Sequence, residues 1–217
     1  GAARNVGLQL AGGRIVTYLD PGNAFRPDHW ASLAAAFEGG APVVRSNARA
    51  LLGETQDGTP NTLIRETPVA GLFRGAEDDE RDLVAASVPI DTVAHLAGTV
   101  ERTGPFRRDL PLGDAWEYWL RLRRVGVVAY NAEGAVDVRI IRQRIVPDPR
   151  YLTVAQSIYQ AYGVAADSAL AQRRSAYVQN VTRLIDAGPD TIADDMKAIE
   201  ALATIFGLEN AVAGRRS

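Results

Sequence analysis

Carboxylates are the side chains left to do acid–base or metal chemistry in this chain, because it has no cysteine and only two histidines, His29 and His95. The missing cysteines exclude a disulfide framework, a zinc ribbon, an iron–sulfur cluster and a cysteine nucleophile. Two histidines are too few for a metal site built on several imidazoles. Any metal ion must therefore be held by carboxylates. The formal charge of −2 argues against strong non-specific binding to nucleic acid.

Two segments match a known pattern at many positions. Residues 3–20 read ARNVGLQLAGGRIVTYLD, and residues 104–122 read GPFRRDLPLGDAWEYWLRL. Together they resemble the family 2 glycosyltransferases of the GT-A fold, in which an A-R-N-x-G helix precedes a strand ending in L-D-x-D-D. In that family a G-x-F…L…G-E-D-W-(D/E)-x-W-L-R-L stretch follows later. The resemblance covers roughly residues 1–145. It implies an inverting transfer of a sugar from a nucleotide-sugar donor to a hydroxyl acceptor, in bacterial surface glycan synthesis.

The chemistry of such a transfer explains why the family needs these residue types. The leaving diphosphate develops charge, which a divalent cation (Mn²⁺ or Mg²⁺) held by carboxylates stabilises. A second carboxylate takes the proton of the acceptor hydroxyl as it attacks the anomeric carbon. The resemblance implies Asp114 and Glu117 as catalytic residues; Arg4, Asn5, Asp20 and Asn23 on the donor side, with Asp20 as metal ligand; and His95 and Trp116 on the acceptor side.

The chain departs from the family pattern in both segments. Where the family has D-x-D-D, Gly22 removes the second carboxylate and Asn23 keeps an oxygen without a charge, which weakens binding of a hard cation. Ala115 stands at the position of the family's base. These losses favour an alternative, a catalytically degenerate binding or assembly module of a longer protein. A third alternative is a purely structural α/β domain without a ligand.

Each implied site residue also has a purely structural interpretation. Asp20 begins a Pro-Gly-Asn turn, in which an aspartate typically bonds the following amides. Asp114 suits the first turn of a helix, where a carboxylate is favourable. Trp116 is spaced as a buried helical face requires. Arg4 could be a surface arginine, and His95 a surface or buried histidine with satisfied hydrogen bonds.

The elements that position these residues follow from periodicity and turn residues. Residues 4–11 are expected to form a helix, residues 14–19 a buried strand, and residues 114–124 a second helix with an apolar face. Another helix opens at Pro27, and a strand begins at Pro42, so the opening alternates helix and strand. That alternation predicts crossover connections and parallel strands.

The remaining segments complete the predicted organisation. Residues 127–130 and 135–141 are expected to be two strands, and three helices follow, the last starting at Pro189. The fold class is α/β: a GT-A-like, mostly parallel sheet flanked by helices, N-terminally incomplete because the family's first strands are missing, and then a C-terminal helical segment. Pro147-Asp148-Pro149 marks the boundary between a partial GT-A-like domain, 1–146, and a helical region, 147–217.

Location and partners are expected from what the sequence lacks. No apolar run is long enough to cross a membrane, and the first residues do not form a signal peptide. We therefore expect a cytoplasmic protein, with peripheral attachment to the inner membrane as an open alternative. The expected partners are a nucleotide sugar, a glycan acceptor, and either a second copy of the chain or another domain of the same polypeptide.

Overall fold

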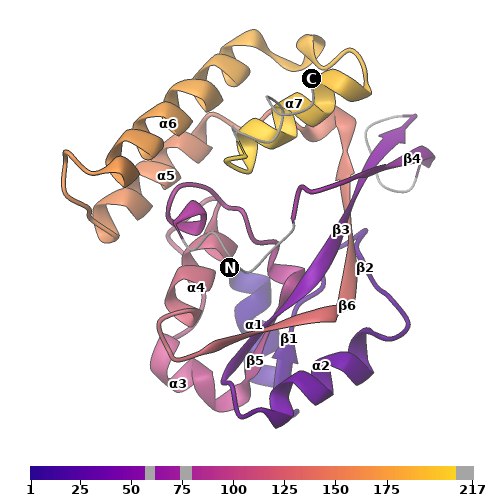
Figure 1. The fold of residues 1–217 in the computed structure, drawn as a ribbon, viewed down its shortest axis with the longest axis vertical. Helices are drawn as coiled ribbons and strands as arrows, with labels where there is room; N and C mark the ends of the chain where they lie inside the picture. Colours follow the sequence, from indigo (N-terminus) through magenta and orange to yellow (C-terminus); the bar gives the residue numbers. More distant parts are fainter. Residues whose placement is uncertain (57–61, 74–79, 209–217) are drawn as a thin grey trace. The chain divides into compact units, whose positions relative to one another are not determined.

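The computed structural model describes residues 1–56, 62–73 and 80–208 (Figure 1). The chain divides into two compact units. The first comprises Gly1–Arg49, Phe73–Glu77 and Val88–Val138, and the second Ala50–Leu72, Asp78–Ser87 and Arg139–Ser217. All the predicted site residues belong to the first unit.

The first unit is built on a sheet with strand order β1-β5-β3-β6-β2. Its strands are β1 (Ile15–Thr17), β5 (Val93–Leu96), β2 (Ala24–Phe25) and the parts of β3 (Val43–Thr55) and β6 (Val128–Ile141) that fall in this unit. The helices are α1 (Ala2–Leu10), α2 (His29–Glu38), α3 (Val100–Thr103) and α4 (Asp114–Leu122). The predicted α/β class with flanking helices is confirmed.

Alternation along the central strands gives the sheet of this unit two apolar faces. Val43 and Val93 belong to a buried cluster with Trp119 of α4, whereas their neighbours Val44 and Ala94 pack with Leu33 of α2. Successive side chains of a strand point to opposite faces, so these pairs place α4 on one side and α2 on the other. Asp114 is therefore the first residue of a helix whose buried face packs against the sheet.

The strand directions correct the prediction of a mostly parallel sheet. The pairs β1–β5, β3–β5, β3–β4 and β2–β6 are all antiparallel. Strand β5 lies between β1 and β3, because Val16 and Val43 are both opposite His95. Strands β1 and β3 therefore do point the same way, as the α2 crossover requires, but they are not neighbours. A later segment of the chain has been inserted between them.

Strand β6 corrects the predicted pair of strands at 127–130 and 135–141. It is one continuous strand through the segment that was expected to turn. The Asn131 side-chain oxygen accepts a hydrogen bond from the Gly134 backbone N–H, 2.9 Å away, as it would in a turn. The polar turn-like residues therefore make their local contact without reversing the chain.

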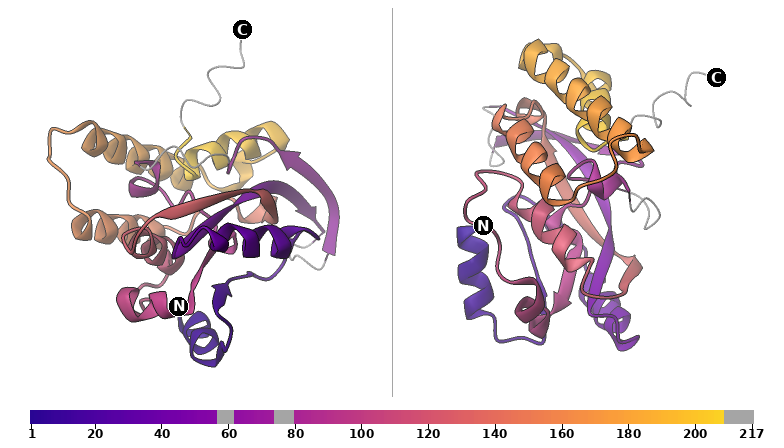
Figure 2. Two further views of the ribbon diagram at one scale, coloured as in Figure 1. Left: turned by 60° about the horizontal axis from the view of Figure 1, so that its bottom comes forward. Right: turned by 90° about the vertical axis from the view of Figure 1, so that its left-hand side faces the viewer.

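The second unit contains the C-terminal helices α5 (Arg150–Ala161), α6 (Ala169–Ala187) and α7 (Asp195–Ile205), as well as β4 (Leu63–Val69), which pairs with the second half of β3. Figure 2 shows α5 and α6 side by side, with α7 against α6. The last helix begins later than the predicted Pro189, which opens only a 3-10 turn (Pro189–Thr191). The Asp194 side chain caps α7 by accepting from the Lys197 N–H.

The described helices include none that is both long enough and apolar enough to cross a membrane. The boundary predicted between residues 146 and 147 remains a prediction.

Candidate functional site

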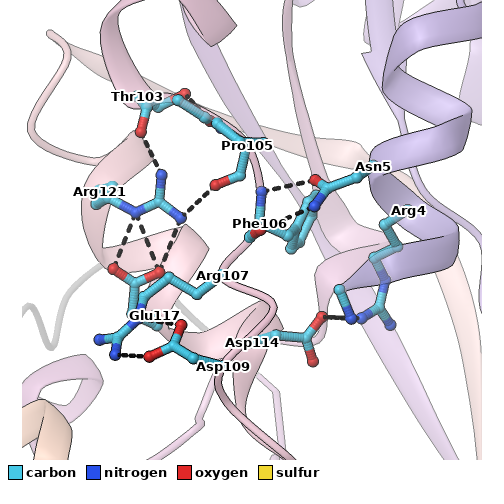
Figure 3. A network of polar contacts seen from close by, with 12 residues as sticks. Arg4, Asn5, Thr103, Pro105, Phe106, Arg107, Asp109, Asp114, Glu117 and Arg121 are labelled. Atoms are coloured by element: carbon cyan, nitrogen blue, oxygen red, sulfur yellow. Dashed lines mark hydrogen bonds and ion pairs between the residues drawn. The ribbon is translucent and has the colours of Figure 1, made fainter.

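Arg4 joins the two carboxylates that the sequence singled out. One guanidinium nitrogen, Nη2, donates to both oxygens of Asp20, at 2.6 and 2.8 Å, and Nη1 donates to Asp114 Oδ2 at 2.9 Å. The three residues come from α1, from the loop after β1 and from the first turn of α4. The structure therefore brings Asp20, predicted on the donor side, and Asp114, a predicted catalytic carboxylate, together on the Arg4 guanidinium, and Figure 3 shows Arg4 beside Asp114.

The charges of this cluster stabilise one another. Burial lowers the pKa of Arg4, but the ion pairs with Asp20 and Asp114 outweigh it, and the net shift is upward. Burial raises the pKa of Asp114, but the Gly1 amino group, 2.7 Å away, and the Arg4 guanidinium bring it below its ordinary value. The carboxylate of Asp114 is therefore ionised at neutral pH and is a weak base while it is paired.

Asn5 holds the loop that precedes α4. Its amide nitrogen donates to the Phe106 carbonyl, and the Phe106 N–H donates back to its amide oxygen, each at 2.8 Å (Figure 3). Asn5 is 2% exposed. Asn5 thus positions Phe106, whose ring lies 5.7 Å from the guanidinium carbon of Arg4, and its donor contact remains a prediction.

The segment after β1 forms a tight turn. The Asn23 N–H donates to the Asp20 carbonyl at 3.1 Å, and Gly22 has φ 94°. Proline followed by glycine in the left-handed region is the pattern of a type II turn. Gly22 therefore occupies a backbone conformation that an aspartate adopts only with strain.

Asp91 is a site residue that the sequence did not reveal. It is buried, its Oδ1 accepts the Asp20 N–H at 2.5 Å, and it also accepts from the Asn23 side chain. Burial raises the pKa of Asp91 despite these hydrogen bonds. The amide of Asn23, predicted on the donor side, is therefore turned to Asp91, and the pair fixes the turn that carries Asp20.

The donor set does not fit a divalent cation. Both Asp20 oxygens are bonded to Arg4, Gly22 offers no side-chain oxygen, and the Asn23 side chain bonds Asp91. Among the described residues, no group of three acidic, histidine or cysteine side chains could hold a metal. Hard cations need several oxygen ligands, and at the predicted metal position the one carboxylate, Asp20, is already paired with Arg4.

Glu117, predicted to be catalytic, is held in an ion pair with Arg121, and its catalytic role remains a prediction. Its two oxygens accept three hydrogen bonds of 2.8–3.0 Å from Arg121, and the side chain is 7% exposed. Arg121 also donates to the Pro105 carbonyl at 2.9 Å and to the Thr103 carbonyl (Figure 3). The pair therefore fixes the backbone before Phe106.

His95, predicted on the acceptor side, lies in the core of the first unit with no exposed surface. Its Nδ1 is 2.9 Å from the Leu96 carbonyl, which can only accept, so Nδ1 carries the proton. Nε2 then accepts from the Tyr18 hydroxyl at 2.7 Å. Burial lowers the pKa of His95, which matches this neutral tautomer. The histidine is therefore part of the aromatic core, and its place on the acceptor side remains a prediction.

Trp116 is also buried, at 2% exposure, and its acceptor contact remains a prediction. Its spacing along α4 reflects core packing, which was the structural interpretation of the same pattern.

The comparisons with known proteins bear on the fold. No protein-family model and no curated protein matches the chain. Two solved structures of S. aureus TarS are similar. The match to TarS 1-349 has a TM-score of 0.51 at 12% identity, and it covers 85% of this chain and 49% of the TarS chain. The match to the longer TarS structure has a TM-score of 0.53 at 13% identity, and it covers 83% of this chain and 30% of the TarS chain.

This chain thus spans about half of one TarS chain and under a third of the other. At these identities, the likeness concerns the fold alone. The chain has a mixed α/β fold similar to that of TarS.

Proposed function

We propose that this chain is the part of a glycosyltransferase-like domain in which Arg4 holds the diphosphate of a nucleotide-sugar donor and Asp114 takes the proton of the acceptor hydroxyl. The observation that carries the proposal is the Arg4 guanidinium, bonded at once to Asp20 and Asp114. The donor class is supported by TarS, because TarS 1-349 has also been solved in complex with UDP and with UDP-GlcNAc.

Arg4 suits a diphosphate for physical reasons. A guanidinium presents several N–H donors in a planar fork that matches phosphate oxygens as well as carboxylates. The Arg4 side chain is 23% exposed, so an anion in solution can reach it. A diphosphate that takes over the hydrogen bonds of Arg4 would release Asp114 from that ion pair and leave its contact with the Gly1 amino group, 2.7 Å away. The pKa of Asp114 would then rise, which makes it a better base.

The proposed transfer is a single displacement. The acceptor oxygen bonds to the anomeric carbon, and the bond from that carbon to the diphosphate oxygen breaks, with its electron pair leaving on the diphosphate. The acceptor proton passes to the Asp114 carboxylate, and Arg4 stabilises the charge that develops on the leaving group. The inverting outcome and a bacterial surface glycan as acceptor rest on the motif resemblance and belong to the proposal.

A second candidate is a binding module without turnover. It is favoured by Ala115 at the position of the family's base and by the engagement of Glu117 with Arg121. Both candidates predict donor binding, but only the transferase predicts that the Asp114 carboxylate is required for release of the nucleotide.

The experiment compares binding and turnover in the same chain. Calorimetry with UDP-GlcNAc, UDP-glucose and GDP-mannose measures binding, and nucleotide release with water as acceptor measures turnover. The transferase proposal predicts binding of at least one donor and loss of release in Asp114→Asn. Asp109→Asn is the matched control, because Asp109 lies in the preceding loop with a side chain that is 64% exposed.

The outcomes separate the candidates. Release that is lost in Asp114→Asn and kept in Asp109→Asn supports the transferase. Binding with no release above background supports the binding module, and a gain of release in Ala115→Asp would then show that the base alone is missing. Absence of binding for every donor contradicts both.

A further inference from the structure

We infer that Arg4 takes the place of a divalent cation, so that the donor diphosphate binds without metal, and that Asp20 competes with the diphosphate instead of helping to hold it. This inference rests on the proposed function, and it departs from the metal-ligand role that the motif resemblance implies for Asp20.

The contacts of Asp20 are those of a carboxylate already paired with a cation. Both of its oxygens lie 2.6–2.8 Å from Nη2 of Arg4. A divalent ion coordinated by Asp20 would have to displace this guanidinium or sit beside its positive charge. Either is unfavourable, because like charges at such distances repel and a hard cation needs more than one anionic ligand.

Neither Gly22 nor Asn23 of the turn adds a second carboxylate to Asp20. Gly22, with φ 94°, has no side chain and holds the turn in a left-handed conformation. The Asn23 amide bonds the Asp91 carboxylate. The buried Asp91 itself accepts the Asp20 N–H, so its lone pairs are directed into the turn. The Asp20–Asn23 turn is thus held by hydrogen bonds and carries one carboxylate, that of Asp20.

The guanidinium, in contrast, is held as a preformed anion site. Phe106 lies beneath it, 5.7 Å from ring centroid to guanidinium carbon, and Asn5 fixes the Phe106 backbone by a reciprocal pair of hydrogen bonds. Asp20, whose side chain is 43% exposed, is the more accessible of the two carboxylates on Arg4. An arriving diphosphate would therefore exchange with Asp20 first.

This exchange makes a prediction opposite to that of a metal site. Replacing Asp20 by asparagine removes the competing charge but keeps the size of the side chain. If Arg4 binds the diphosphate directly, Asp20→Asn binds the donor as tightly as the wild type or more tightly. If Asp20 is a metal ligand, the same variant loses the metal-dependent part of binding.

The test is calorimetric titration of UDP, and of whichever donor binds, into the full chain in EDTA and in Mn²⁺. We expect dissociation constants in the two buffers to agree within about twofold. We expect Asp20→Asn to tighten binding in EDTA by about two- to fivefold, the effect of removing one partly exposed, screened ion pair. Asp109→Asn controls for the change in net charge.

Arg4 variants supply the second arm. Arg4→Gln should weaken binding at least about tenfold, the loss expected for a charge-assisted hydrogen bond to phosphate, and Arg4→Lys should retain part of it. Circular dichroism of each variant checks that it has folded. If Arg4→Gln does not fold, Arg4→Lys, which keeps a positive charge between the two carboxylates, serves as the test variant.

Each outcome decides the inference. Metal-independent binding that is lost in Arg4→Gln and kept or tightened in Asp20→Asn supports it. Binding that needs Mn²⁺, or that Asp20→Asn weakens tenfold, overturns it and leaves the proposed function standing. No binding in either buffer overturns the proposed function and the inference together.

Discussion

The Asn5–Phe106 pair allows a prediction whose size follows from the structure. Asn5→Ala removes one donor and one acceptor from a site in which Asn5 is 2% and Phe106 1% exposed. The Phe106 N–H and carbonyl then lose the partners that lie at 2.8 Å in the wild type. Each buried backbone group without a partner costs about 1–3 kcal/mol, so the variant should lose roughly 2–4 kcal/mol, allowing for some entry of water.

The assay should report on the loop itself. Native-state hydrogen exchange of the Phe106 amide measures the free energy of local opening. A loss of roughly 2–4 kcal/mol corresponds to exchange about 30- to 1,000-fold faster, since about 1.4 kcal/mol is a factor of ten. A thermal melt of the same variant should show a lower midpoint.

The matched control is Gln9→Ala, which removes an exposed amide from the same helix. It should leave the Phe106 amide as protected as in the wild type. If Asn5→Ala also leaves this protection unchanged, then Asn5 does not hold the loop and the positioning role assigned to it is wrong.

Three further predictions concern the buried charges and the turn. Arg121→Ala leaves the buried Glu117 carboxylate without its cation and should destabilise the chain by about 3–5 kcal/mol in urea unfolding. A change below about 1 kcal/mol would contradict the stabilising role of the Glu117–Arg121 ion pair. Burial lowers the pKa of His95, so below about pH 6.5 the unfolded chain binds a proton that the folded chain does not. The free energy of unfolding should therefore decrease as the pH is lowered through this range, by up to about 1.4 kcal/mol per pH unit. Thermal melts at a series of pH values should show that the stability of His95→Gln depends less steeply on pH than that of the wild type, and equal dependences would refute this. Gly22→Asp should cost about 1–3 kcal/mol, because φ is 94°, without creating a requirement for Mn²⁺ in donor binding; a new requirement would show that the turn can still form a metal site.

Much of the local structure could be predicted, because its causes are local. The helix at Asp114 and the turn at Asp20 each depend on a few adjacent residues, and both are present. The convergence of Asp20 and Asp114, 94 positions apart in sequence, was expected only from the motif resemblance, but both carboxylates do lie on one guanidinium.

Pairing between distant segments could not be predicted. The alternation of helix and strand correctly indicates that β1 and β3 point the same way, but nothing local indicates that β5 lies between them. The continuity of β6 was missed for a similar reason. Asn131 and Gly134 form a turn-like contact whose outcome depends on the neighbouring strands.

Burial sets the surroundings of several predicted site residues, and residue type does not reveal it. His95 and Trp116 are polar or aromatic residues at motif positions, yet both are enclosed by the core. One signal was available for Glu117: Arg121 follows it by four positions on a helix, a spacing that favours an ion pair. Asp91 offered no comparable signal, because its partners are a backbone N–H and a distant asparagine.

The most direct test of the central claim is phosphorus-31 NMR of UDP-GlcNAc in EDTA, as the full chain is added. We predict that the two diphosphate resonances shift or broaden with the wild type, do so at least as strongly with Asp20→Asn, and remain close to their free positions with Arg4→Gln. Diphosphate resonances that do not respond to the wild-type chain, or that respond equally to Arg4→Gln, would contradict the account.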